Sequence, residues 1–240
     1  MLRKPHRCVA GHAIVLLLSN AAWAQQTLPK FEIGVQFSSL SLQRPSQIIG
    51  SSFIPGAVGV APGVGSRTEP GFGGRVTYNL TSNIAFEAEG NLFPRSQGLA
   101  TNGQSLGMPG GRIFQGQFGV KAGKRFRRFG IFGKARPGFI GFTQVNKLLS
   151  THIVSNPPPQ PPFTVGNFGV GRDIYFSMDV GGAIEYYPRQ RVFARFDLGD
   201  TIVHYATYRE SGAFLSRAII TRDPETKHGL QMSAGIGFRF

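Results

Sequence analysis

The chain has 240 residues, with 33 glycines, 21 phenylalanines and a formal net charge of +14, and its mean hydropathy is near zero at −0.07. This length suits one domain. No segment reaches the ~18 consecutive apolar residues that a membrane-spanning helix needs. The single cysteine, Cys8, precedes the predicted cleavage site described below. The composition therefore excludes a transmembrane helix, disulfides and cysteine-metal sites in the processed chain.

The first 24 residues are typical of a secretory signal peptide. They combine three basic residues near the start, an apolar run over 13–18 and small residues at Ala22 and Ala24. We predict cleavage before Gln25. Because residues 1–24 contain three bases and no acids, their removal lowers the net charge from +14 to +11.

Eight later segments alternate between apolar and polar or small residues. Because successive side chains of a strand point to opposite faces, this period predicts strands with two unlike faces. In the first segment, Phe31 and Ile33 face one way, while Glu32 and Gly34 face the other. The predicted strands are 30–42, 72–80, 84–93, 113–123, 129–142, 174–187, 192–205 and 230–240.

The connections between these strands alternate between long and short. Long loops are predicted at 43–70, 94–111, 143–172 and 206–227, and short turns at 81–83, 124–128 and 188–191. This alternation is typical of outer-membrane β-barrels, whose short turns are periplasmic and whose long loops are extracellular. Pro137 lacks the N–H that a closed barrel uses, so we predict a bulge or the end of regular pairing there.

Volume and charge predict which face points outward. An eight-stranded barrel has an interior that side chains fill, so the small-residue face belongs inside and the bulky apolar face against lipid. The inner face is also balanced in charge, as paired buried charges require. Its six acids are Glu32, Glu87, Glu89, Asp179, Glu185 and Asp197, and its six bases are Arg75, Lys121, Lys134, Arg136, Arg195 and Arg239.

The inward charges are the candidate site. They could form a gated polar path, but a narrow lumen favours an ionic network that fills it and blocks passage. The predicted network consists of Glu87, Glu89, Lys121, Lys134, Arg136, Asp179, Glu185, Arg195 and Asp197. An aromatic girdle is predicted at the short-turn end, formed by Tyr78, Phe93, Phe126, Tyr186, Tyr187 and Phe240.

The last strand, 230–240, ends on the aromatic Phe240. With the segments 195–203 and 133–138, it resembles the small outer-membrane β-barrel domain family, similar in architecture to OmpA and OmpX. The resemblance implies an all-β fold for residues 25–240, namely an eight-stranded antiparallel transmembrane β-barrel in up-and-down meander order. It also implies that the barrel-assembly machinery binds the strand ending in Phe240. In contrast to full OmpA, we expect no peptidoglycan-binding domain after the eighth strand.

The expected location is the outer membrane of a Gram-negative-type bacterium, reached through the cleaved signal peptide. The expected partners are outer-membrane lipid and lipopolysaccharide, whose phosphates loop arginines such as Arg67 and Arg95 could contact. The basic run 124–128 could suggest nucleic acid. In an exported protein we interpret it instead as a solvated turn or a contact with anionic head groups, with no nucleic-acid partner. The pattern does not identify an extracellular partner.

The leading functional hypothesis is a structural or surface-interaction barrel with long extracellular loops. A small-solute or lipid transport barrel, a lipid-modifying enzyme and a soluble secreted barrel remain as alternatives. We expect no cofactor, metal or catalytic site, because His152, His204 and His228 are scattered and show no metal-ligand spacing. Asp200 and His204 are close in sequence, but a catalytic set is recognised only by geometry.

Overall fold

The computed structural model describes residues 29–51, 58–61, 66–97, 109–155, 163–211 and 218–240. The predicted signal peptide, 1–24, lies outside the described residues. No helix within these ranges is long and apolar enough to cross a membrane.

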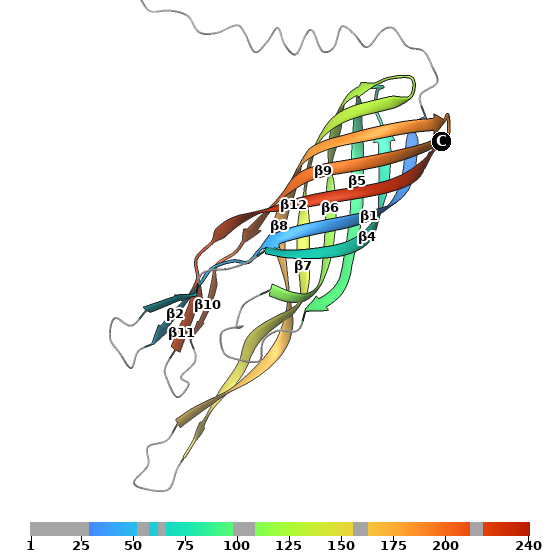
Figure 1. Cartoon of the computed structure of the whole chain (residues 1–240). Coiled ribbons are helices and arrows are strands. Elements are labelled where there is room, and N and C mark those ends of the chain that lie inside the picture. The colour runs from blue at the N-terminus through green and yellow to red at the C-terminus, as the bar shows by residue number, and fades with distance from the viewer. Residues whose placement is uncertain (1–28, 52–57, 62–65, 98–108, 156–162, 212–217) are drawn as a thin grey trace, which may run out of the picture.

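Eight strands close into one antiparallel barrel, as the alternation predicted (Figure 1). Each barrel strand pairs with the barrel strands before and after it in the chain. The last strand closes the barrel by pairing with the first, with Gly34 opposite Gly237. The meander order is therefore confirmed. The barrel strands are β1 (Phe31–Gln43), β4 (Ser66–Asn79), β5 (Ile84–Gln97), β6 (Pro109–Arg125), β7 (Phe129–Val154), β8 (Phe163–Arg189), β9 (Val192–Tyr205) and β12 (Glu225–Arg239).

Two of the predicted long loops contain further strands, and the sequence had left open whether a long loop holds an extra hairpin. A four-stranded sheet in the order β10-β11-β2-β3 lies beyond the long-loop end of the barrel (Figure 1). Its antiparallel pairs join the β1–β4 connection to the β9–β12 connection, through Ile49 opposite Ile220. The strands are β2 (Gln47–Ser51), β3 (Val58–Ala61), β10 (Tyr208–Ser211) and β11 (Ala218–Arg222).

Strands β7 and β8 also run far beyond the predicted boundaries. They have 26 and 27 residues, whereas a tilted strand crosses a bilayer in about 9–11 residues. Most of the predicted loop 143–172 is therefore a paired hairpin that projects past the barrel (Figure 1). Backbone pairing therefore continues past the predicted strand boundaries.

Pro137 does not end the pairing of β7, contrary to the prediction. It pairs with Met178 of β8 without a register shift. On the β6 side, the pairing lapses only locally and resumes in the same register, with Gln117 opposite Gly138 and Val120 opposite Ala135. The missing N–H of proline is thus accommodated by one gap in one ladder.

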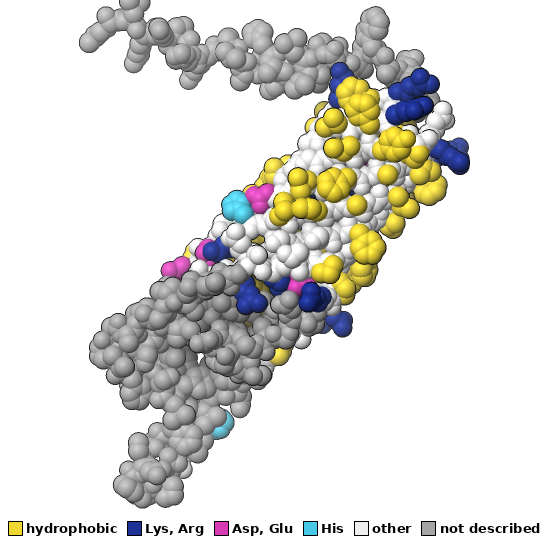
Figure 2. Space-filling view, in the orientation of Figure 1, with side chains coloured by type: hydrophobic (Ala, Val, Ile, Leu, Met, Phe, Trp, Pro, Cys, Tyr) yellow, Lys and Arg dark blue, Asp and Glu magenta, His cyan; other side chains and the backbone are white. Residues whose placement is uncertain are grey.

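The predicted faces are confirmed. Phe37 and Phe196 are 76% and 47% exposed, whereas Glu87 and Arg136 are fully buried. Figure 2 shows apolar side chains spread over the outside of the barrel wall. A soluble barrel would bury its apolar face and leave its charges in water, and this barrel does the reverse.

The aromatic girdle at the short-turn end is confirmed only in part. Tyr78, Phe126, Tyr186 and Phe240 are exposed on the outside. Tyr187 points into the barrel and is buried. Phe93 is also inside and lies at the opposite end, because it follows four inward positions along β5 from the short turn.

Candidate functional site: the filled barrel interior

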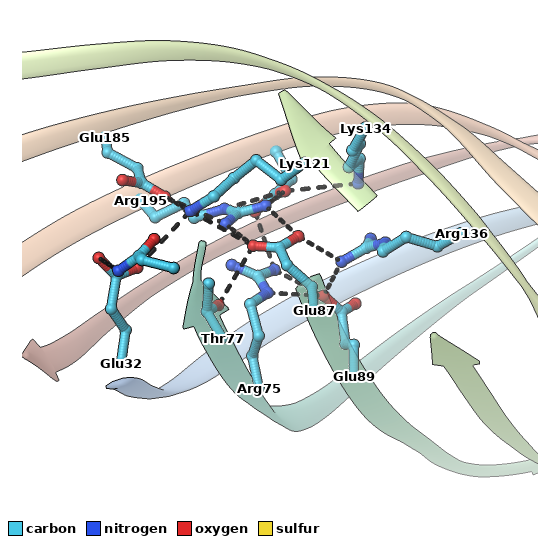
Figure 3. A network of polar contacts seen from close by, with 12 residues as sticks. Glu32, Arg75, Thr77, Glu87, Glu89, Lys121, Lys134, Arg136, Glu185 and Arg195 are labelled. Carbon is cyan, nitrogen blue, oxygen red and sulfur yellow. Dashed lines mark hydrogen bonds and ion pairs between the residues drawn. The ribbon is translucent and has the colours of Figure 1, made fainter. Parts of the chain in front are cut away.

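Arg195 of β9 is the centre of an ionic network in the short-turn half of the barrel (Figure 3). Its guanidinium donates hydrogen bonds to both carboxylate oxygens of Glu87 across the lumen, with Nη2 to Oε2 at 3.0 Å. It also donates to Glu185 Oε1 at 3.1 Å and to Asp197 Oδ1 at 2.7 Å. One planar cation therefore joins carboxylates from three strands, as bidentate arginine geometry allows.

Two further arginines, Arg75 and Arg136, share the carboxylate of Glu89 on β5, and each also contacts a second acid. Arg136 Nη1 lies 2.5 Å from Glu89 Oε2, and its Nη2 lies 2.6 Å from Asp179 Oδ2. Arg75 Nη2 lies 2.6 Å from the same Glu89 oxygen and 2.9 Å from Asp197 Oδ2. Each arginine contacts two acids on different strands, so the network ties the barrel together across its lumen.

Two lysines complete the predicted set. Lys121 Nζ lies 2.6 Å from Glu185 Oε1 and 3.5 Å from Glu87 Oε1. Lys134 Nζ lies 2.8 Å from Asp179 Oδ2 and 3.4 Å from Asp197 Oδ1. All nine residues predicted for the site are thus brought together in one buried network.

Arg125 also belongs to this network, although its place in the basic run 124–128 led us to put it in the turn. Its Nη2 donates to Glu32 Oε1 at 3.0 Å, and its Nε donates to the hydroxyl of Tyr187 at 2.9 Å. Arg239 Nε donates to the same Glu32 oxygen. The network therefore contains seven bases and six acids. The sequence signal for this placement was that position 125 is odd, like the inward-facing Lys121 on β6.

A layer of amides and hydroxyls lies above the charges. Asn91 Oδ1 accepts hydrogen bonds from Gln36 Nε2 at 2.9 Å and from Ser38 Oγ at 3.1 Å, and Asn91 Nδ2 donates to Gln115 Oε1 at 3.1 Å. Gln115 Nε2 in turn donates to Gln231 Oε1 at 3.0 Å. This chain of side chains runs through the lumen, from β1 across to β5 and β6 and back to β12.

Two glycines make close approaches possible in these layers. A Cβ on Gly73 would lie 2.1 Å from Asn91 Oδ1, and a Cβ on Gly199 would lie 2.3 Å from Asp179 Oδ1. The absence of a side chain on one strand thus lets the polar side chain of its neighbour lie across it. The glycines on the inner face are part of the network because they leave it room.

An apolar cap fills the interior at the long-loop end. Tyr175 and Tyr205 pack edge to face, with ring centroids 4.9 Å apart, and Phe142 packs on Tyr175 at 5.9 Å. The sequence prediction missed this cap, because it treated the whole inner face as small and polar. The buried residues of the cap are Leu40, Leu42, Phe93, Ile113, Ile140, Phe142, Val145, Tyr175, Val203 and Tyr205.

The three described histidines, His152, His204 and His228, are exposed outside the lumen. On the outer face, His228 Nδ1 lies 2.6 Å from Asp200 Oδ2, and His204 Nδ1 lies 3.1 Å from Thr226 Oγ1. No group of three or more His, Cys, Asp or Glu side chains suited to a metal ion occurs among the residues that the structure describes. The candidate site is therefore described as an ionic and hydrogen-bonded interior.

A closed eight-stranded antiparallel barrel with an apolar outer wall and buried, paired charges defines a transmembrane β-barrel. No protein-family model matches the chain, and no curated protein matches it by sequence.

Several solved structures are similar to the chain. The outer-membrane protein OprG from Pseudomonas aeruginosa matches with a TM-score of 0.51 and 12% identity, over 89% of this chain and 96% of that one. Neisserial surface protein A matches with a TM-score of 0.46 and 8% identity, over 87% and 97%. The outer-membrane protease OmpT from Escherichia coli matches with 0.46 and 10%, over 92% and 100%. At these identities the OprG match shows a common barrel fold and no common activity.

Proposed function

We propose that the chain is an integral outer-membrane barrel of a Gram-negative-type bacterium. In this proposal its role is structural or surface-interacting, and the extracellular surface is formed by the β7–β8 hairpin and the β10-β11-β2-β3 sheet. Both features lie at the long-loop end, beyond the apolar wall.

The filled interior is the observation that carries this proposal. Charged side chains, amides and an apolar cap follow one another along the barrel axis, and the inward side chains at all three levels are buried. The interior of an eight-stranded barrel is just wide enough for side chains to fill it. Function is therefore assigned to the extensions at the long-loop end rather than to a pore.

A small-solute transport barrel is the second candidate, and it is favoured by one observation. Buried polar atoms of Gln117, Ser177, Asp179 and Gln231 have no hydrogen-bond partner among the described residues. Such atoms could bond to a polar solute between the ionic network and the cap.

Planar-bilayer recordings separate the two candidates. We expect the purified protein to insert without discrete, reproducible conductance steps, because the ionic network and the cap close the lumen in series. Reproducible steps would favour the transport barrel. Insertion itself is checked on a gel, where folded barrel should migrate differently before and after boiling.

Surface labelling tests the proposed orientation. The processed chain contains no cysteine, so single cysteines can be introduced and labelled with a membrane-impermeant maleimide. Ser155→Cys, exposed beyond the β7–β8 strands, should be labelled in intact cells. Ser82→Cys, in the short β4–β5 turn, should be labelled only after the outer membrane is opened. The reverse result would contradict the proposal.

The closing strand supplies a further prediction. Phe240 is exposed on the outer wall, and its backbone N–H donates to the carbonyl of Phe31 at 2.8 Å. Because the proposed recognition signal is a terminal aromatic strand, deletion of Phe240 should reduce the amount of folded protein in the outer membrane. Unchanged amounts of heat-modifiable protein in membrane fractions would show that the residue is not a recognition signal.

A further inference from the structure

Five exposed bases gather on two neighbouring short turns of the barrel. The β6–β7 and β8–β9 turns are adjacent because β7 pairs with β8, and the N–H of Tyr187 donates to the carbonyl of Arg128 at 2.8 Å. Lys and Arg side chains are seen at this end in Figure 2, beyond the apolar wall. We name this surface the basic patch, and it consists of Lys124, Arg127, Arg128, Arg189 and Arg191.

No acid of the described residues pairs with the basic patch. Of its five side chains, Lys124 contacts an aromatic ring, with its Nζ 5.6 Å from the centroid of Phe126. The acids nearest this end, Glu32 and Glu185, point into the lumen and are buried. The interior beneath has one base more than its acids, so it adds to the positive field.

Three exposed aromatic side chains form an outward-facing surface directly below the patch. Phe126 stacks on Phe129 with ring centroids 4.4 Å apart, and Phe129 lies opposite Tyr186 on β8. Their exposed fractions are 39%, 44% and 52%. Aromatic rings at this position lie at the border between head groups and acyl chains. Bases above apolar rings match a molecule with an anionic head and hydrocarbon tails.

Among the described residues, the rest of the barrel rim differs from the basic patch, and at the short-turn end its one further exposed base is Lys30. The third short turn, residues 80–83, contains no charged residue. At the long-loop end, exposed bases are interspersed with acids, such as Asp200 and Glu225, and Arg67 is turned inward to Glu69. The patch is therefore a local feature of one side of the short-turn end.

We propose that the basic patch and the three aromatic rings bind an anionic phospholipid of the periplasmic leaflet. The phosphate lies among the bases of the two turns, and the acyl chains lie along Phe126, Phe129 and Tyr186. This inference rests on the proposed function, since it places the short turns at the inner face of the outer membrane.

Native mass spectrometry of the purified full chain, mixed with equal amounts of phosphatidylglycerol and phosphatidylcholine, tests the site. A base near an anionic surface contributes a factor of about five in binding. The unaltered protein should therefore retain phosphatidylglycerol at least about fivefold over phosphatidylcholine. The variant R127Q/R128Q/R189Q should lose this preference.

A matched variant removes the same charge from the other end of the barrel. R44Q/R95Q/R112Q neutralises three exposed arginines at the long-loop end and should keep the preference. R127K/R128K/R189K keeps the charge of the patch and should also keep the preference. If the glutamine variant does not fold, the unaltered protein still tests whether the lipid preference depends on charge. Roughly 1 M salt shortens the Debye length to ~3 Å and should abolish the preference.

Equal lipid retention by the unaltered protein and the glutamine variant would overturn the site. Co-sedimentation with purified peptidoglycan that is lost in the glutamine variant, without any lipid preference, would assign the patch to the cell-wall polymer instead. Gel migration before and after boiling keeps the two proposals apart. A heat-modifiable barrel without lipid preference overturns only the lipid site, whereas loss of heat modifiability counts against the membrane barrel itself.

Discussion

Replacing Arg195 by glutamine is expected to lower the free energy of unfolding by about 3–5 kcal/mol, because it breaks a buried ion pair by removing one partner. The substitution leaves Glu87, Glu185 and Asp197, which are all buried, without their shared cation. Urea titration of the barrel folded into lipid vesicles, followed by the gel migration of unboiled samples, measures the loss.

Two variants make this result specific to the network. Arg44→Gln removes the same charge from an exposed position at the long-loop end, outside the basic patch, and should change the free energy of unfolding by less than about 0.5 kcal/mol. Arg195→Lys keeps the charge but loses the bidentate contact with Glu87, so it should fall between the two. A loss for Arg195→Gln as small as that for Arg44→Gln would mean that the interior charges are solvated.

The wall and the ionic network could be predicted because both depend on local sequence parity. Once Phe31 and Glu32 are assigned to opposite faces, strand geometry fixes the direction of every later side chain in that strand. The balance of acids and bases then indicated the inner face. Arg125 was missed because a basic run at a turn was treated as one unit, although its odd position on β6 continues the inward series of Lys121.

The apolar cap and the additional sheet could not be predicted on the same grounds. Inward residues such as Leu40, Ile113 and Val203 are apolar, so at the long-loop end the two faces no longer differ in polarity. The pairing of β11 with β2 joins segments about 170 positions apart, and no local pattern encodes such a contact. Pro137 was over-interpreted, because one missing N–H interrupts one ladder without ending a strand held on its other side.

The second large effect is expected on the outer wall, where Phe196→Lys should cost about 2–4 kcal/mol of folding free energy in vesicles. Phe196 faces outward between Ile184 of β8 and Ala234 of β12, which also face outward. A lysine there would place its ammonium against acyl chains, and its outward neighbours on the paired strands, Ile184 and Ala234, have no charge. The same urea titration in vesicles measures this loss.

Two further variants test how the cost of a substitution depends on depth in the membrane and on the face of the barrel wall. Ser41→Lys introduces the same charge on the outward face of β1, near the long-loop end, where the cost of a charge falls to about 0–1 kcal/mol. Ala183→Ser changes the inner face between Phe132 and Asp197 and should cost much less than Phe196→Lys, because a hydroxyl there has polar neighbours. Equal losses for Phe196→Lys and Ala183→Ser would contradict the assignment of the two faces. If Phe196→Lys were no worse than Ser41→Lys, the apolar wall would not lie in hydrocarbon, and the exposed phenylalanines would need a protein partner instead.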